Sequence, residues 1–387
     1  MAGDDQETPT RTKSFTSDSD LKISVSSPKD SKGKICRAIF EVSSEILKKH
    51  SEYFAASLRF NKCNGHSQVE LEGDNIEAMF IWILYMHSKE EGHTEEWQDK
   101  LFYDNSVTRG AHVSTIWYIL EAGDKYLFKS SLLQGFSRRW YTKNVNFTKL
   151  SVYLVQTLPV PCYMFSHAKG YMEVTKWLAY NSVGGIQENE PPRSNWKHLP
   201  LVAPDFVGRI DSTVYCLRLV LQNRIWEIVR YLHQEGRLCD TCTLLAKAVS
   251  LHVDPFHLWF PKHSVHDTLN LLRPLTMNSS GSEVRVTTSC GACRIDWVTR
   301  IRDAIRITEH YFHGLCIDCM NHSKEEDRTW SKEAWKLAGQ RDGRWDTDCT
   351  IKHGEPTWYA SWMGTEDSRQ FHLEELHGKK PVHMGLY

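Results

Sequence analysis

The segment that most constrains this fold is residues 75–87 (NIEAMFIWILYMH), in which almost every side chain is apolar. A helix that is apolar all round has no polar face to turn toward water, so other parts of a domain must enclose it. The longest apolar run, residues 78–86, is roughly half the length that a membrane span requires. We therefore expect a buried helix inside a globular domain and no membrane association.

The residues around this helix predict a small β-sheet. Residues 22–25 and residues 35–42 are strand-like, and the Pro-, Asp- and Gly-containing stretch 26–34 between them is typical of a turn. Residues 68–71 alternate polar and apolar side chains and predict a third strand. A hairpin and one further strand should therefore form the sheet.

Serine residues mark the starts of two helices between the second and third predicted strands. A serine oxygen at an N-cap accepts a hydrogen bond from a backbone N–H of the first helical turn. We expect Ser43 or Ser44 to cap a helix that carries Leu47, and Ser51 to cap a helix that carries Tyr53. These two helices and residues 75–87 would cover the sheet.

Helical periodicity dominates the rest of the chain, most clearly at residues 212–234. Another helix is expected at residues 296–312, and Gly314 behind it is a typical C-terminal stop. The predicted organisation is a disordered tail (1–20), a first domain with an inserted loop at 88–111 (21–146), a helical region (147–286) and a Cys/His-bearing segment (287–387).

The succession of elements in the first domain resembles the BTB/POZ domain. The matching pieces are residues 40–54 (FEVSSEILKKHSEYF), residues 69–74 (VELEGD), the buried helix with Tyr85, and residues 120–128 (LEAGDKYLF). The resemblance implies an α+β fold, in which helix pairs cap a small sheet, and a role in protein–protein interaction. The chain also resembles a fungal type of BTB protein through residues 165–186, 314–319 and 349–353, which implies a shared architecture.

Cysteine spacing points to a zinc site in the C-terminal segment. Two Cys-x-x-Cys pairs and a Cys-x3-His element fall close together there, and such pairs can reach one Zn²⁺ ion with little backbone strain. A structural site takes four ligands, so two of the six candidates would be left over. The candidates are Cys290, Cys293, Cys316, Cys319, Cys349 and His353.

The alternative for these cysteines is burial as small apolar side chains. We favour burial for the remaining pair, Cys239 and Cys242, because no second pair lies close in sequence. A redox role is not favoured for any pair, since none follows the strand-to-helix context of thioredoxin-like sites.

Charge and motifs narrow the function further. The 47 Lys and Arg residues and 48 Asp and Glu residues give a net charge of −1, which argues against a surface built for nucleic acid. Phosphate-loop, metalloprotease and nucleophile-elbow motifs are missing, so we expect no enzymatic activity. The first twenty residues have no apolar core of a signal peptide, so a location in the cytoplasm or nucleus is expected.

We therefore interpret the chain as an intracellular adaptor that binds a protein partner or a second copy of itself through its first domain. The hydrophobic contact strip is expected on the exposed sides of the helices at 44–58 and 76–87. One alternative is a ubiquitin-ligase substrate adaptor that docks a cullin scaffold. The other is a nuclear or chromatin-associated factor with a structural zinc site, for which Arg294, Arg300, Arg302 and Arg306 would supply basic side chains.

Overall fold

The computed structural model describes residues 10–28, 33–62, 67–92, 113–186, 206–234, 239–240, 242–243, 262–276 and 296–317. These residues fall into two compact units. Unit 1 contains the described residues of Met1–Asn146 and of Val160–His167. Unit 2 contains those of Phe147–Pro159, Ala168–Glu188 and Leu201–Tyr387. The fold is mixed α+β, as predicted, with one small sheet and a majority of helices.

Unit 1 carries the sheet and its covering helices: β1 (Arg11–Ser14), β2 (Leu21–Ser26), β3 (Arg37–Val42), α1 (Ser44–His50), α2 (Glu52–Lys62), β4 (Gln68–Glu72), α3 (Ile76–Glu90), α5 (Val113–Lys125), η1 (Ser130–Leu133) and α6 (Gln134–Asn144). Unit 2 is helical: α7 (Val152–Gln156), α9 (Ala168–Asn181), α10 (Phe206–Gln234), α12 (Val265–Leu272), η4 (Arg273–Thr276) and α13 (Trp297–Tyr311). In sequence, α8 (Pro159–Met164) lies between α7 and α9, and its residues from Val160 on belong to unit 1.

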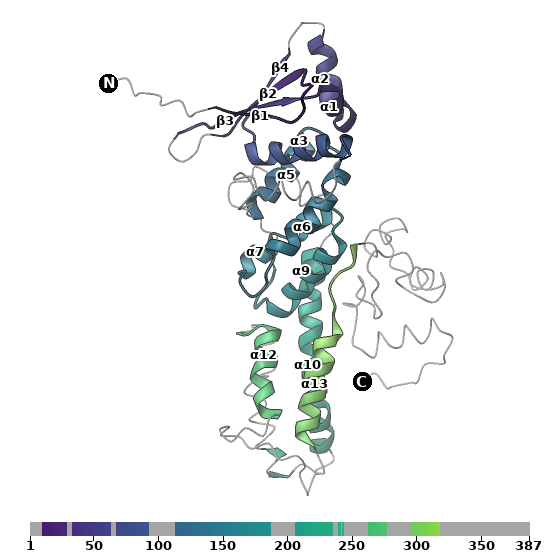
Figure 1. Cartoon of the computed structure of the whole chain (residues 1–387). Coiled ribbons are helices and arrows are strands. Elements are labelled where there is room, and N and C mark those ends of the chain that lie inside the picture. The colour runs from purple at the N-terminus through teal and green to yellow at the C-terminus, as the bar shows by residue number, and fades with distance from the viewer. Residues whose placement is uncertain are drawn as a thin grey trace, which may run out of the picture. The chain divides into compact units, whose positions relative to one another are not determined.

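The sheet has four strands in the order β1-β3-β2-β4 (Figure 1). β2 and β3 form the predicted antiparallel hairpin, while β4 pairs parallel to β2 and β1 pairs parallel to β3. Burial alternates along β2, β3 and β4 because successive side chains of a strand point to opposite faces. The buried face includes Ile23, Phe40 and Leu71.

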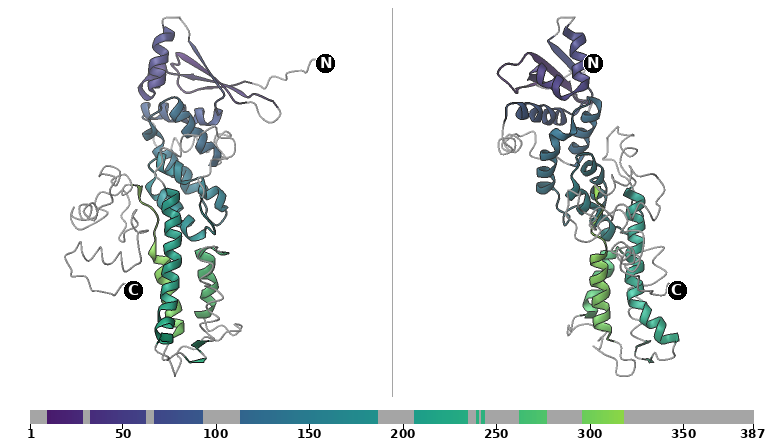
Figure 2. Two further views of the ribbon diagram at one scale, coloured as in Figure 1. Left: turned by 180° about the vertical axis from the view of Figure 1, so that it is seen from behind. Right: turned by 90° about the vertical axis from the view of Figure 1, so that its right-hand side faces the viewer.

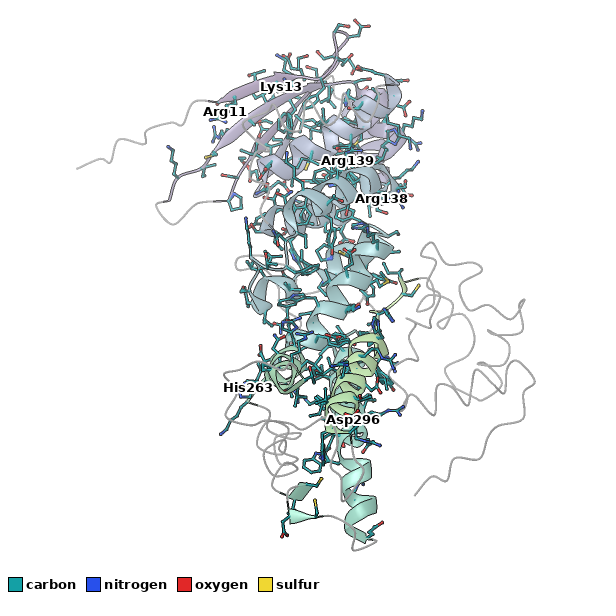
Figure 3. All side chains as sticks on the ribbon, turned by 60° about the horizontal axis from the view of Figure 1, so that its bottom comes forward. Arg11, Lys13, Arg138, Arg139, His263 and Asp296 are labelled. Carbon is teal, nitrogen blue, oxygen red and sulfur yellow. The ribbon has the colours of Figure 1, made fainter. Side chains whose placement is uncertain are left out.

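The strand β1 lies inside the segment predicted to be a disordered tail, so the structure corrects that prediction for Arg11–Ser14. All four side chains of β1 are polar and exposed, so this part of the sequence shows no apolar periodicity that would predict a strand. Backbone pairing with β3 holds the strand, and Phe15 behind it is half-buried with its ring against those of Phe40 and Phe80. Figure 3 labels Arg11 and Lys13 on this edge of the sheet.

The start of α1 also differs from the prediction. Ser43 is the N-cap residue, but its side chain makes no capping hydrogen bond. Asp20 performs this role instead, because one carboxylate oxygen accepts from the Ser44 backbone N–H and the other from the Ser44 hydroxyl, both at 2.6 Å. A carboxylate suits this position because it meets the positive end of the helix dipole. The prediction for Ser51 is confirmed, since its hydroxyl accepts from the Phe54 backbone N–H at 3.0 Å.

The helix α3 is the buried element that the sequence predicts. All of its side chains from residue 78 to residue 88 are buried. Trp82 donates from its indole N–H to the Ile119 carbonyl at 2.7 Å and so joins α3 to α5. Arg139 on α6, labelled in Figure 3, donates to the Tyr85 hydroxyl of α3 at 3.0 Å. Unit 1 is therefore organised around this helix.

Unit 2 is a helical bundle in which α10 packs against α9 and α13, and α12 packs against α9 (Figure 2). The expected helix at residues 296–312 is observed as α13, and Asp296 caps it by accepting from the Thr299 backbone N–H at 3.0 Å. Its apolar side is buried, while Arg302 and Arg306 are exposed. None of the described helices in either unit is both long and apolar enough to cross a membrane.

After α13, residues 312–316 form a non-helical segment that runs along α9, and all of them except His313 are buried. Its backbone is fixed by two hydrogen bonds, from Leu315 N–H to the Thr175 hydroxyl (2.8 Å) and from Phe312 N–H to the Tyr180 hydroxyl (3.3 Å). Gly314 has φ +109° and touches the backbone of Met172 so closely that a Cβ atom would not fit. Gly314 is thus required by this close approach and lies beyond the helix end rather than at it.

Candidate interaction surface and candidate metal ligands

A buried acidic residue organises the end of α5. Asp74, between β4 and α3, is only 7% exposed, and its backbone N–H donates to the Ser26 carbonyl at 3.1 Å. Its carboxylate accepts from the Lys125 ammonium group at 2.8 and 2.9 Å and from the Tyr126 hydroxyl at 2.6 Å. Lys125 and Tyr126 of the sequence 120–128 are therefore tied to the strand–helix junction at Asp74.

Burial and the nearby charge of Asp74 keep the Tyr126 hydroxyl protonated. Burial raises the pKa of Tyr126 far above its usual value, and the hydrogen bond and charge of Asp74 raise it further. The tyrosine therefore stays protonated and continues to donate to the carboxylate. Burial also raises the pKa of Glu121, to which the negative charge of Asp74 adds.

The backbone behind Tyr126 turns through Leu127 in a left-handed conformation, with φ +50°. Leu127 N–H donates to the Asp124 carbonyl (3.2 Å) and Phe128 N–H donates to the Gly123 carbonyl (2.8 Å). This pair of bonds is the Schellman motif, in which glycine is the usual residue at the left-handed position. A leucine in this left-handed conformation lowers stability by about 1–2 kcal/mol. Leu127 therefore occupies the position despite a conformational penalty.

The side chain of Leu127 points into solvent and is 51% exposed. Tyr53 on α2 is 40% exposed, and its ring lies edge-on to that of Tyr126 at 5.1 Å between centroids. The Ser51 hydroxyl donates to the Tyr126 carbonyl at 2.6 Å and fixes this turn to the start of α2. Tyr53 contacts Tyr126, and Leu127 directly follows Tyr126 in the chain; we call these two exposed side chains the Tyr53–Leu127 surface.

The structure corrects the predicted hydrophobic strip on the helix at 76–87, whereas Tyr53 lies within the predicted helix at 44–58. The helix α3 offers no exposed apolar side chain between residues 78 and 88, because the sheet, α1 and α5 pack around it. On α1 and α2, Tyr53 is the exposed large apolar residue among the side chains that the structure describes. Leu127 was missed, since its exposure and its positive φ depend on the fold. The LEAGDKYLF motif is the one sequence signal that leads to it.

A histidine pair lies near the other end of α3. His87 is buried, accepts from the Ser43 backbone N–H through Nε2 (3.1 Å) and donates through Nδ1 to the Ile83 carbonyl (2.9 Å). These two bonds fix the neutral tautomer, and burial lowers the pKa of His87. His50 is also buried, and its Nε2 lies 2.8 Å from Glu90 Oε1. His87 binds the residue before α1, and His50 of α1 binds Glu90 of α3. Both histidines therefore stabilise the packing of α1 against α3.

Of the six candidate zinc ligands, the structure describes Cys316 alone. Cys316 is a fully buried thiol in the non-helical segment beside α9. Cys290, Cys293, Cys319, Cys349 and His353 lie outside the described residues. Within the part of the chain that is described, no group of three His, Cys, Asp or Glu side chains could hold a metal ion. Cys316 has the donor atom that zinc prefers, and the rest of the predicted site stays a prediction.

The basic residues proposed for nucleic acid are divided on α13. Arg302 and Arg306 are exposed, while Arg300 is half-buried and Arg294 lies outside the described residues. Arg306 lies 3.4 Å from the exposed carboxylate of Asp303. This mixed charge gives no continuous basic stripe on the helix, and phosphate binding depends on clustered cations.

The chain was compared with protein families, curated proteins and solved structures, and none of the three comparisons found a match.

Proposed function

We propose that the chain is a non-enzymatic adaptor whose unit 1 is a BTB/POZ-type domain that binds a protein partner through the Tyr53–Leu127 surface. The observation that carries the proposal is Leu127. A large apolar side chain is held half in solvent, in a backbone conformation that favours glycine, by hydrogen bonds on both sides. Residues kept in unfavourable backbone conformations concentrate at binding and catalytic sites.

The order and pairing of elements in unit 1 support the BTB/POZ assignment. An antiparallel hairpin, a short helix pair, a strand parallel to the first hairpin strand, a buried helix and a further helix follow one another in the chain. The family resemblance implies the same succession. Apolar and aromatic anchors surrounded by polar side chains are typical of protein–protein contacts.

A cullin scaffold and a second copy of the chain are the two partners to test first. The tagged full-length chain would be mixed with a purified cullin, and its own mass would be measured separately by analytical ultracentrifugation. We expect saturable binding in one of the two experiments. The Leu127→Asn variant should weaken that binding at least tenfold, because asparagine tolerates the left-handed conformation but removes the apolar contact.

A matched control is Tyr153→Ser, which removes an exposed aromatic side chain from unit 2. This variant should bind as the parent does. Equal binding by the Leu127→Asn and parent chains would refute the proposed surface. A monomeric chain that binds no cullin and turns over a small molecule would refute the adaptor proposal itself.

We also propose that zinc, where bound, has a structural role in unit 2. Support comes from the donor type and spacing of the six candidates and from the burial of Cys316 beside α9. Metal content of the purified chain should be near stoichiometric and should fall in a Cys290→Ala/Cys293→Ala variant. A metal-free parent chain, purified without chelator, would refute zinc binding.

A further inference from the structure

In unit 2, Cys239 directly precedes helical residue Asp240, and Cys242 is itself helical. The Thr243 backbone N–H donates to the Cys239 carbonyl at 2.9 Å, and the Cys242 backbone N–H donates to the Cys239 sulfur at 3.4 Å. Side chains three residues apart on a helical turn lie on the same face, with Cβ atoms about 5–6 Å apart. A disulfide needs a Cβ separation of about 3.5–4.5 Å, so a closure of about 1–2 Å would join the two sulfurs.

The two cysteines differ in access to solvent. Cys239 is half-buried, whereas Cys242 is 1% exposed and accepts a hydrogen bond from the Trp297 indole N–H at 3.3 Å. Trp297, at the start of α13, is itself buried. Cys239 is therefore the residue of the two that a soluble reagent would meet first. Because Cys242 is closed to solvent and lies three residues from Cys239, its sulfur would attack a group already attached to Cys239 rather than a soluble reagent.

We propose that Cys239 and Cys242 form a reversible oxidation site for soluble disulfides of the glutathione class. The Cys239 thiolate attacks one sulfur of oxidised glutathione, which forms a mixed disulfide and releases one glutathione thiolate. The Cys242 thiolate then attacks the Cys239 sulfur and releases the second glutathione. Two protein thiols are oxidised to one disulfide, the oxidant is reduced to two thiols, and the two thiol protons leave with them.

This assignment differs from the expectation that the pair serves only packing. The sequence carries no strand-to-helix context for a redox motif, but the structure leaves Cys239 partly exposed and buries Cys242 three residues later. The new bond would turn the Cys242 sulfur toward Cys239 and away from Trp297. Oxidation would thus alter a buried contact at the N-terminal end of α13.

The test uses the folded full-length chain, equilibrated with mixtures of oxidised and reduced glutathione. Remaining thiols are then alkylated and the digest is analysed by mass spectrometry. We expect the peptide with both cysteines to become disulfide-bonded as oxidised glutathione increases, and to return to two thiols when reduced glutathione is restored. Cys216 provides an internal control, because burial raises the pKa of its thiol and no cysteine lies at Cys-x-x-Cys spacing from it.

Two variants separate the steps. Cys242→Ser should stop at the mixed disulfide, with one glutathione attached to Cys239. Cys239→Ser should leave Cys242 unmodified in the folded chain, although it reacts fully in denaturant. Circular dichroism would verify that both variants fold. The proposal is overturned if the parent pair stays reduced in excess oxidised glutathione, or if Cys239 takes up no glutathione in the Cys242→Ser chain.

Discussion

Replacement of Gly314 by alanine should strongly destabilise unit 2. The new Cβ would lie 2.7 Å from the carbonyl carbon and 2.8 Å from the Cγ atom of Met172, and still closer to the carbonyl oxygen. Carbon–oxygen contacts in proteins are about 3.3–3.6 Å. The obstacle is the backbone of α9, so a side-chain rotation cannot relieve it.

The cost can be estimated from the contacts that must separate. A left-handed φ costs an L-residue about 1–2 kcal/mol. A shift of the segment away from α9 also breaks the hydrogen bonds of Leu315 and Phe312, and each buried donor left unpaired costs about 1–3 kcal/mol. We therefore expect the free energy of unfolding to fall by at least about 3 kcal/mol, which is large for a single substitution.

Urea denaturation followed by circular dichroism measures this loss, and hydrogen exchange of α9 and of residues 312–317 localises it to unit 2. Gly184→Ala is the matched control, because no atom of a neighbouring residue lies within 4 Å of the point that its new Cβ would occupy, and its φ is ordinary. That variant should be neutral or slightly more stable. A Gly314→Ala chain within about 0.5 kcal/mol of the parent would show that the close approach to Met172 does not exist.

Three further changes test the packing of each unit. Tyr126→Phe removes a donor from buried Asp74 and should cost about 1.5–3 kcal/mol in urea denaturation; a loss below about 0.5 kcal/mol would contradict this role. Burial lowers the pKa of His87 in the folded chain, so the unfolded chain binds the proton more readily, and stability should decline as the pH falls through about 6.5 and below. The His87→Gln variant should lose less stability over this pH range than the parent chain. A variant whose pH profile equals that of the parent would refute the hydrogen bond from Ser43 to a neutral His87. Ser264→Ala removes the hydroxyl that accepts from the Asp267 backbone N–H, which is the serine half of the capping box on α12, and should lower stability by about 1 kcal/mol; an unchanged midpoint of thermal unfolding would show that this bond does not stabilise the helix.

The buried helix α3 and the amphipathic helix α13 were predictable because their signals are local. An all-apolar run has one energetically acceptable location, and a stripe at helical spacing fixes which side of a helix faces the core. The cap at Ser51 was predictable for the same reason, since its partner Phe54 is three residues away.

The features that carry the candidate surface depend on residues far apart in the chain. Asp20 replaces Ser43 as the capping group across 24 positions, and Asp74 orders Tyr126 across 52. The LEAGDKYLF motif identifies this region but does not reveal that Leu127 is exposed and left-handed. Such contacts form only where two separate elements pack together, so the apolar periodicity of either element does not predict them.

The sequence by itself determined that the chain has a small sheet, a central buried helix and a long helical remainder, because apolar spacing and turn residues act within a few positions. Tertiary structure alone decided that β1 joins the sheet, that Leu127 faces solvent and that Gly314 must lack a side chain. The physical reason is that backbone pairing, exposure and close approach are properties of two segments together, and neither segment carries them alone.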